Sequence, residues 1–120
     1  MRIHILMVIL LGSLAFAGCS KGRSTDGLIE DLKSTHEEHR INAVRLLQQR
    51  KGDAPKVVPA LIESLKDEHA DIRWSAAIGL GYFGAEAKPA IPSLEKAQGD
   101  TDARVREAAR VAISRIGGQK

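Results

Sequence analysis

Two histidines that flank two glutamates are the first residues in this chain that could bind a metal. The segment His36-Glu37-Glu38-His39 offers the imidazoles and carboxylates that zinc sites of helical metalloproteases use. That chemistry needs histidines four residues apart, because both must face one metal from one side of a helix. Here they are three apart. The segment therefore predicts a polar turn and no zinc site.

A second set of candidate ligands recurs along the chain. His36, His69 and Asp102 stand 33 residues apart and could approach one another at successive helix starts. An aspartate just before a helix is a preferred N-cap, because its carboxylate accepts hydrogen bonds from the first-turn N–H groups. We therefore expect structural roles for all three residues, and no metal.

No residue pattern supports nucleophilic or phosphate chemistry. The serines lack the glycine-flanked turn that exposes a catalytic hydroxyl, and the chain has a single cysteine, Cys19. Gly79, Gly81 and Gly84 lie in or at the end of an expected helix and not in a phosphate-binding loop. Two neighbouring helical hairpins would also offer little concavity. We predict no catalytic residue, cofactor or small-molecule substrate, and that the chain is not an enzyme.

The residues before Cys19 have the layout of a secretory signal. Residues 1–18 carry a basic tip, then an apolar run over 5–11, then small residues. The run is too short for a spanning helix. An uncleaved N-terminal anchor is the alternative.

The end of this segment resembles the lipobox of bacterial lipoproteins. Phe16-Ala17-Gly18-Cys19 carries the resemblance, which implies cleavage after residue 18 and a lipid on Cys19. It also implies a location in the bacterial cell envelope, anchored to a membrane. Ser20 after the cysteine favours the outer membrane over the inner one. Residues 19–25 read as a flexible tether.

The charge of the chain does not indicate a nucleic-acid partner. Its net charge is +3, and removing residues 1–18, which hold one arginine and no acidic residue, leaves about +2. The charges of both signs are interspersed, so no basic footprint forms. We expect no nucleic-acid binding.

The chain repeats itself every 33 residues. The segment 28–40, LIEDLKSTHEEHR, aligns without a gap with 61–73, LIESLKDEHADIR. A fixed period of this length is typical of stacked solenoids, in which each unit buries its apolar face against its neighbours.

Apolar spacing within each unit predicts two helices. Positions such as Ile72, Ala76, Leu80 and Phe83 share one helical face. We expect helices at 28–33, 41–50, 72–83, 90–97 and 102–116, and another that has Pro59 in its first turn. We expect no strand.

The second and third units resemble HEAT repeats of the short bacterial, phycobilisome-lyase type. The matching residues are Pro59, Asp67, Ile72-Arg73, Ala76-Ala77 and Leu80-Gly81-x-Phe83-Gly84, then Pro92, Asp100, Val105-Arg106, Ala109, Ile113 and Ile116-Gly117. The resemblance implies an all-α, right-handed superhelix of about three helical hairpins over residues 26–118, divided into 26–56, 57–89 and 90–118.

The resemblance also assigns a structural role to the repeated charges. In HEAT stacks, aspartates and arginines of the turns pair between neighbouring units as a ladder. Here this implies a structural ladder of Asp67, Arg73, Asp100 and Arg106, with Arg40 at the equivalent first position. Ser34 replaces the first aspartate, and we expect it to leave the first rung without an acidic partner.

The middle unit carries a second apolar stripe, off its core face. Trp74, Ile78 and Tyr82, here called the Trp74 stripe, are four residues apart, and Ile41 and Val111 can extend it onto neighbouring units. If the stripe is exposed, these five residues form a protein-binding surface. The alternative is that the repeats curl tightly and bury it.

These observations favour a lipid-anchored HEAT-repeat scaffold or adaptor that binds a protein of unknown identity. Two alternatives remain. One is a lyase-like or metal-dependent enzyme of the phycobilisome-lyase type, and the other is a structural envelope lipoprotein that self-associates.

Overall fold

The computed structural model describes residues 22–118, which form a succession of helices. The α-helices are α2 (Thr25–Asp31), α3 (Glu37–Leu47), α4 (Ala54–Ser64), α5 (Ala70–Phe83), α6 (Ile91–Ala97) and α7 (Ala103–Gly117). Short 3₁₀ segments at Lys51–Asp53 and Gly84–Ala90 precede α4 and α6. No strand occurs within the described residues, and the predicted all-α class is confirmed.

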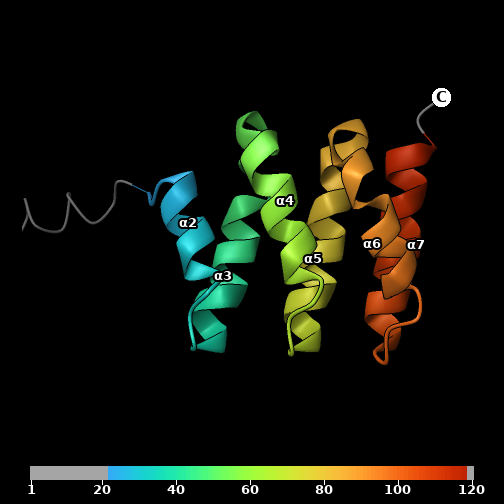
Figure 1. The fold of residues 1–120 in the computed structure, drawn as a ribbon, viewed down its shortest axis with the longest axis horizontal. Coiled ribbons are helices and arrows are strands. Elements are labelled where there is room, and N and C mark those ends of the chain that lie inside the picture. Colours follow the sequence, from blue (N-terminus) through green and yellow to red (C-terminus); the bar gives the residue numbers. More distant parts are fainter. Residues whose placement is uncertain (1–21, 119–120) are drawn as a thin grey trace, which may run out of the picture.

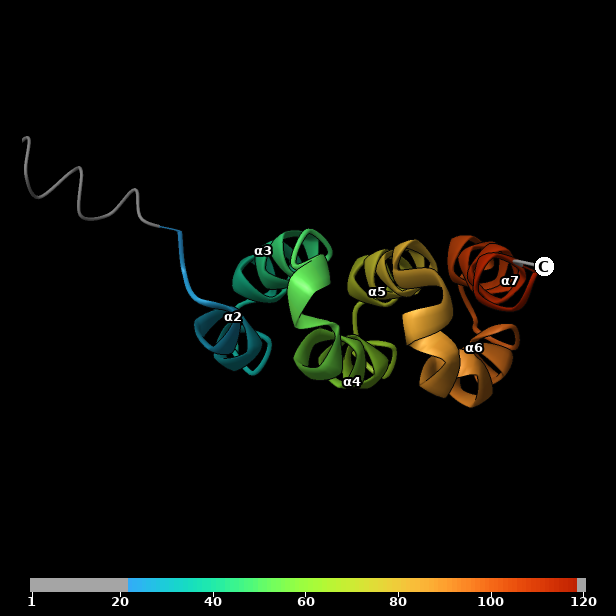
Figure 2. The same ribbon diagram turned by 90° about the horizontal axis from the view of Figure 1, so that it is seen from above.

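The helices form two layers (Figures 1 and 2). Helices α2, α4 and α6 lie in one row, and α3, α5 and α7 lie in the other. Each helix of the second row packs against the first-row helix that precedes it, and α5 packs against both α3 and α7. This stack of helical hairpins is the predicted solenoid.

The positions that recur every 33 residues form the core between the layers. Leu28, Leu61 and Leu94 are at most 1% exposed, as are Ala43, Ala76 and Ala109. The leucines come from the first row and the alanines from the second, so each unit contributes the same two faces. Burial of these apolar groups is the main favourable term that holds the hairpins together.

Helix α4 differs from the prediction, which placed Pro59 in a first helical turn. The helix begins at Ala54 with Pro55 in its first turn, and Pro59 lies inside it. An interior proline removes one backbone hydrogen bond and costs about 3 kcal/mol. Val57, Val58 and Leu61 are at most 3% exposed, and their burial favours extending the helix across Pro59.

The ends of the second-row helices follow local capping chemistry. Helix α3 begins at Glu37 and ends at Leu47, both earlier than in the predicted 41–50. Its early start is favoured by Glu37 and Glu38, because acidic residues in a first turn complement the helix dipole. Asp102 caps α7 as predicted, accepting hydrogen bonds from the N–H groups of Arg104 and Val105. Helix α5 stops at Gly84, whose φ of 57° suits glycine.

Several predictions concern residues outside the described range. The signal over 1–18, the lipobox at Phe16–Cys19 and residues 19–21 of the tether over 19–25 lie there. Among residues 22–118, no helix combines the length and the hydropathy needed to cross a membrane. The three unit boundaries also stay predictions.

Candidate interaction surface

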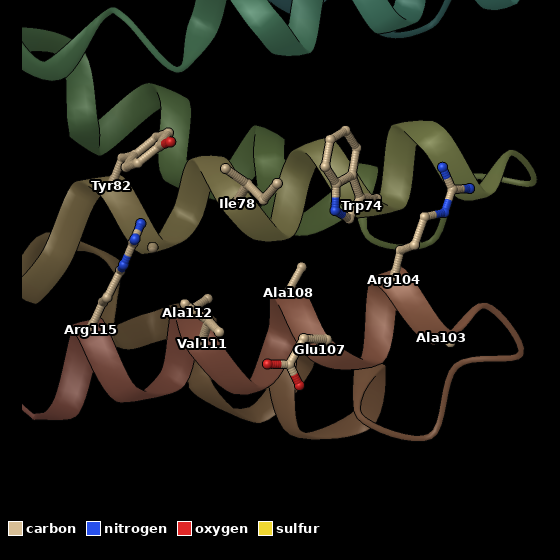
Figure 3. A pocket seen from close by; sticks show the side chains of 11 residues that line it. Trp74, Ile78, Tyr82, Ala103, Arg104, Glu107, Ala108, Val111, Ala112 and Arg115 are labelled. Carbon is tan, nitrogen blue, oxygen red and sulfur yellow. The ribbon is translucent and has the colours of Figure 1, made fainter.

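The Trp74 stripe lies on the outer side of α5, and its two aromatic rings are exposed. Trp74 is 39% exposed and Tyr82 is 49% exposed, whereas Ile78 between them is half-buried against the core. A spacing of four residues places all three on one side of the helix, as Figure 3 shows. The alternative in which tight curling buries the aromatic rings is therefore wrong.

A groove of about 560 Å³ runs between α5 and α7 beside this stripe. Its residues from α5 are Trp74, Ile78, Gly81 and Tyr82, and those from α7 are Ala103, Arg104, Glu107, Ala108, Val111, Ala112 and Arg115. The lining is mostly apolar, and its volume lies within the range of ligand-binding sites.

Small residues bring the two helices close together under this groove. A Cβ placed on Gly81 would lie 3.2 Å from the Cα of Ala112, closer than ordinary van der Waals contact. Glycine at this position therefore permits the close approach of α5 to α7. The larger side chains of Trp74, Tyr82 and Arg104 also line the groove.

A second groove of about 550 Å³ lies on the other side of the stripe, between α3 and α5. Ile41, Arg45 and Gln48 line it from α3, facing the same three residues of the Trp74 stripe. The Gln48 amide donates to the carbonyl and hydroxyl oxygens of Ser75, at 2.8 and 2.9 Å, and ties α3 to α5.

The structure thus gathers all five predicted contact residues onto one face. Ile41 borders one groove, Val111 borders the other, and the Trp74 stripe is shared by both. We call these five residues and the two grooves the central surface. Its role in binding stays a prediction.

Two arginines of α7 stack on the exposed rings. The sequence analysis did not identify these contacts. The Arg104 Cζ lies 6.0 Å from the Trp74 ring centroid, and the Arg115 Cζ lies 5.4 Å from that of Tyr82. Guanidinium groups are attracted to the faces of aromatic rings. The 33-residue period could have indicated one contact, since Arg115 is the repeat equivalent of Tyr82.

Carboxylates hold Arg104 in place. Its Nη2 lies 2.9 Å from both Asp71 Oδ1 and Asp102 Oδ2. These hydrogen bonds raise the pKa of Arg104, and the Arg104 side chain is the main cause that lowers the pKa of Asp102 to about 2. Arg104 and Asp102 therefore stay ionised at neutral pH.

The charged ladder lies at the turn end of the helices, away from the central surface. Arg40 Nε and Arg73 Nε donate to Asp67 Oδ2 and Asp100 Oδ2, each at 2.8 Å, and a second N–H of each arginine donates to the other carboxylate oxygen. Such bidentate pairs are the stronger form of ion pair. All four side chains are largely buried.

Hydrogen bonding within the ladder shifts the pKa values of its members. The carboxylates of Asp67 and Asp100 raise the pKa of Arg40 and Arg73, respectively, and the Arg73 side chain lowers the pKa of Asp100. Each shift favours the charged form. The paired state is thus the stable one at neutral pH.

The prediction that the first rung lacks an acidic partner is wrong. Arg40 and Arg73 reach forward to the aspartate of the following unit, so Arg40 pairs with Asp67 and the absence of an aspartate at Ser34 costs Arg40 nothing. Arg106 is the member without a carboxylate partner among the described residues, and it donates to the carbonyls of Asp100 and Thr101. Aligned copies reveal equivalent residues but not which copy pairs with which.

The candidate metal ligands lie at separate helix starts. His36, His69 and Asp102 are the N-cap residues of α3, α5 and α7. His69 Nδ1 lies 3.1 Å from Glu37 Oε2. Within residues 22–118, no three His, Cys, Asp or Glu side chains converge as a metal site would require.

Comparisons with known proteins identify the repeat. A family model described as HEAT repeats matches residues 25–114. No curated protein is significantly similar to the chain. Among solved structures, a chain in the complex of CpcE and CpcF of phycocyanin lyase from Nostoc sp. PCC7120 is similar, with a TM-score of 0.72 and 27% identity. The match covers 81% of this chain and 38% of that one, so this chain spans well under half of its neighbour.

This neighbour corrects the prediction that the chain is not an enzyme. The similar chain belongs to a lyase, so likeness to this fold does not support the exclusion of enzymatic activity. The prediction failed because it relied on local motifs and on the expectation that two hairpins offer little concavity. The groove between α5 and α7 is formed by residues some 30 positions apart, which no local motif reveals.

Proposed function

The chain belongs to the HEAT-repeat family, and we propose that it binds another protein through the central surface while a lipid on Cys19 holds it at the bacterial cell envelope. The observation that carries the binding proposal is the pair of exposed rings, Trp74 and Tyr82, with a groove on either side. Tryptophan, tyrosine and arginine are the commonest anchors of protein interfaces. The similar lyase chain occurs in a complex with a second protein, which supports association.

Capture with matched variants tests the binding proposal. We compare the full chain with Trp74→Ala and with Leu46→Ala, since Leu46 is 44% exposed but borders neither groove of the central surface. Wild type and Leu46→Ala should capture the same protein from cells that produce the chain. Trp74→Ala should weaken that complex by about 2 kcal/mol or more if Trp74 is a central anchor. Equal capture by all three chains would refute the role of the surface.

The envelope location rests on the lipobox-like residues Phe16-Ala17-Gly18-Cys19, the last of which is the only cysteine. A lone cysteine in an exported protein calls for an explanation, and lipidation supplies one. At least two acyl chains are needed for stable anchoring. An outer-membrane location is part of the same proposal, because Ser20 follows the cysteine.

Replacement of Cys19 by Ala tests the anchor. The wild-type chain should carry the mass of acyl chains and sediment with membranes, and the variant should lose that mass and be uncleaved or soluble. If the variant still requires detergent for extraction, the N-terminal apolar run is the anchor and the lipobox interpretation fails.

A lyase-type activity is the second candidate function, and the structural neighbour favours it. The groove between α5 and α7 has the size and apolar lining of a small-molecule site. Mixing the full chain with phycocyanin and following its visible absorption tests this directly. A spectral change that depends on Trp74 would support catalysis at the central surface, and an unchanged spectrum would count against activity on phycocyanin.

A further inference from the structure

We propose that the segment of the partner that occupies the groove between α5 and α7 is an amphipathic helix whose polar edge is acidic. This inference rests on the proposed function, that the central surface binds a protein. It adds the secondary structure and the charge of the bound segment. Each of the two properties follows from a different feature of the groove.

Hydrogen-bonding capacity favours a helix over an extended segment. The backbone groups along α5 and α7 are bonded within those helices, so the groove offers few free partners to an incoming backbone. Its lining contains no amide or aliphatic hydroxyl side chain. In the adjoining groove, the Gln48 amide is already bonded to Ser75. An extended peptide would bury unpaired N–H and C=O groups, whereas a helix pairs its own.

The shape of the groove suits a helix as well. The Trp74 stripe spans nine residues, or eight steps of about 1.5 Å each, which is about 12 Å and roughly two helical turns. Helices α5 and α7 run side by side along this length in Figures 1 and 3. Rows of side chains four residues apart pack into the equivalent rows of another helix. Gly81, Ala108 and Ala112 leave room for large apolar side chains at positions i, i+4 and i+7 of the partner.

The charges that border the central surface favour an acidic partner. Arg104 is already paired with Asp71 and Asp102, and Glu107 is paired with Arg110. Two other arginines, Arg115 beside Tyr82 and Arg45 in the neighbouring groove, have no carboxylate within ion-pair distance among the described residues.

Arg115 is the arginine best placed to receive a carboxylate. Its guanidinium lies over the Tyr82 ring at one end of the groove, where its planar N–H donors match a carboxylate from an occupant. A partner carboxylate there would form a charge-assisted pair. A basic helix would instead add positive charge beside Arg115 and Arg45.

Selection from an unbiased display library of random peptides tests the proposal on the full chain. The library contains helical, extended and proline-rich sequences. Selected peptides should share apolar residues at helical spacing together with Asp or Glu, and should become helical on binding. Their binding should quench or shift the fluorescence of Trp74, the only tryptophan.

Matched arginine variants test the charge. Arg115→Gln should weaken the selected peptides by about fivefold, as loss of a well-formed exposed ion pair allows, and added salt should reduce that difference. Arg106→Gln changes charge equally on the same helix, but Arg106 does not line the groove between α5 and α7 and bonds only the backbone carbonyls of Asp100 and Thr101 among the described residues. It should leave binding unchanged.

The outcomes separate the inference from the proposed function. Basic, extended or proline-rich peptides that bind in a Trp74-dependent way would overturn the inference and leave the proposed function standing. Peptides insensitive to both Trp74→Ala and Val111→Asp, or the absence of any binder, would overturn both. Concentration-dependent dimerisation that protects Trp74 from quenching would identify the occupant as a second copy and also overturn the acidic-helix proposal.

Discussion

The turn end and the outer face of the solenoid both depend on arginines, but they use them in opposite ways. At the turn end, Arg40 and Arg73 repeat the same bidentate contact with an aspartate of the next unit and are largely buried. On the central surface, Arg104 and Arg115 stack on two exposed rings that only the middle unit carries. Positions where the repeats agree hold the stack together, and positions where they differ create a surface with distinct chemistry.

Removal of a ladder arginine should have the largest effect. Arg73→Ala leaves Asp100 largely buried without its partner, and breaking a buried pair costs about 3–5 kcal/mol. We expect the lower part of this range, because about a tenth of each side chain is exposed. The melting temperature, measured by circular dichroism, should fall markedly.

Arg106→Ala is the matched control for that experiment. Arg106 stands at the equivalent position, but among the described residues it bonds only backbone carbonyls. Its replacement should destabilise the fold clearly less. If Arg73→Ala kept its stability but lost partner binding, Arg73 would be a binding residue. The contrast between a structural ladder and a binding surface would then be wrong.

Truncation of the exposed tryptophan should affect stability much less. Trp74→Ala should cost well under the 3–5 kcal/mol that is typical of a buried tryptophan. The native fluorescence of Trp74 should be quenched efficiently by acrylamide. A blue-shifted, quencher-protected emission in the monomer would instead mean that the stripe is core, like the ladder.

The smallest expected effect is a difference between wild type and Arg73→Ala in how stability depends on pH. Arg73 lowers the pKa of Asp100 in the folded state, so this aspartate adds stability above its unfolded pKa of about 3.9, and the contribution is lost as pH falls through the folded value. The denaturation midpoint of wild type should therefore fall more steeply below about pH 4 than that of Arg73→Ala. Parallel curves would show that the pair contributes no pH-dependent stability.

The sequence predicted the features that recur, because repetition is visible without a structure. The HEAT-like solenoid and the Asp102 cap were predicted and are confirmed. The start of α4 was not, since burial of Val57 and Val58 outweighs the cost of Pro59 inside a helix. Helix propensities of single residues, such as that of proline, do not include the free energy gained by tertiary packing.

Features formed between units could not be predicted in the same way. The pairing of Arg40 with Asp67 joins two different copies, and alignment alone does not give its direction. The groove between α5 and α7 depends on the approach of Gly81 to Ala112, which are 31 positions apart. The exclusion of enzymatic activity is overturned by the likeness to a lyase chain, which no local motif indicated.

The forward reach of the ladder gives the stack a polarity, like that of a polymer with two chemically different ends. Arg40 and Arg73 each bond an aspartate 27 residues later, so the middle unit offers an acceptor to the unit before it and a donor to the unit after it. A designer who lengthens this protein after α7 would find the donor, Arg106, already in place and would need to supply only an aspartate at that spacing. Growth before α2 would require both a new arginine and an aspartate in place of Ser34. The solenoid is therefore easier to extend in one direction than in the other.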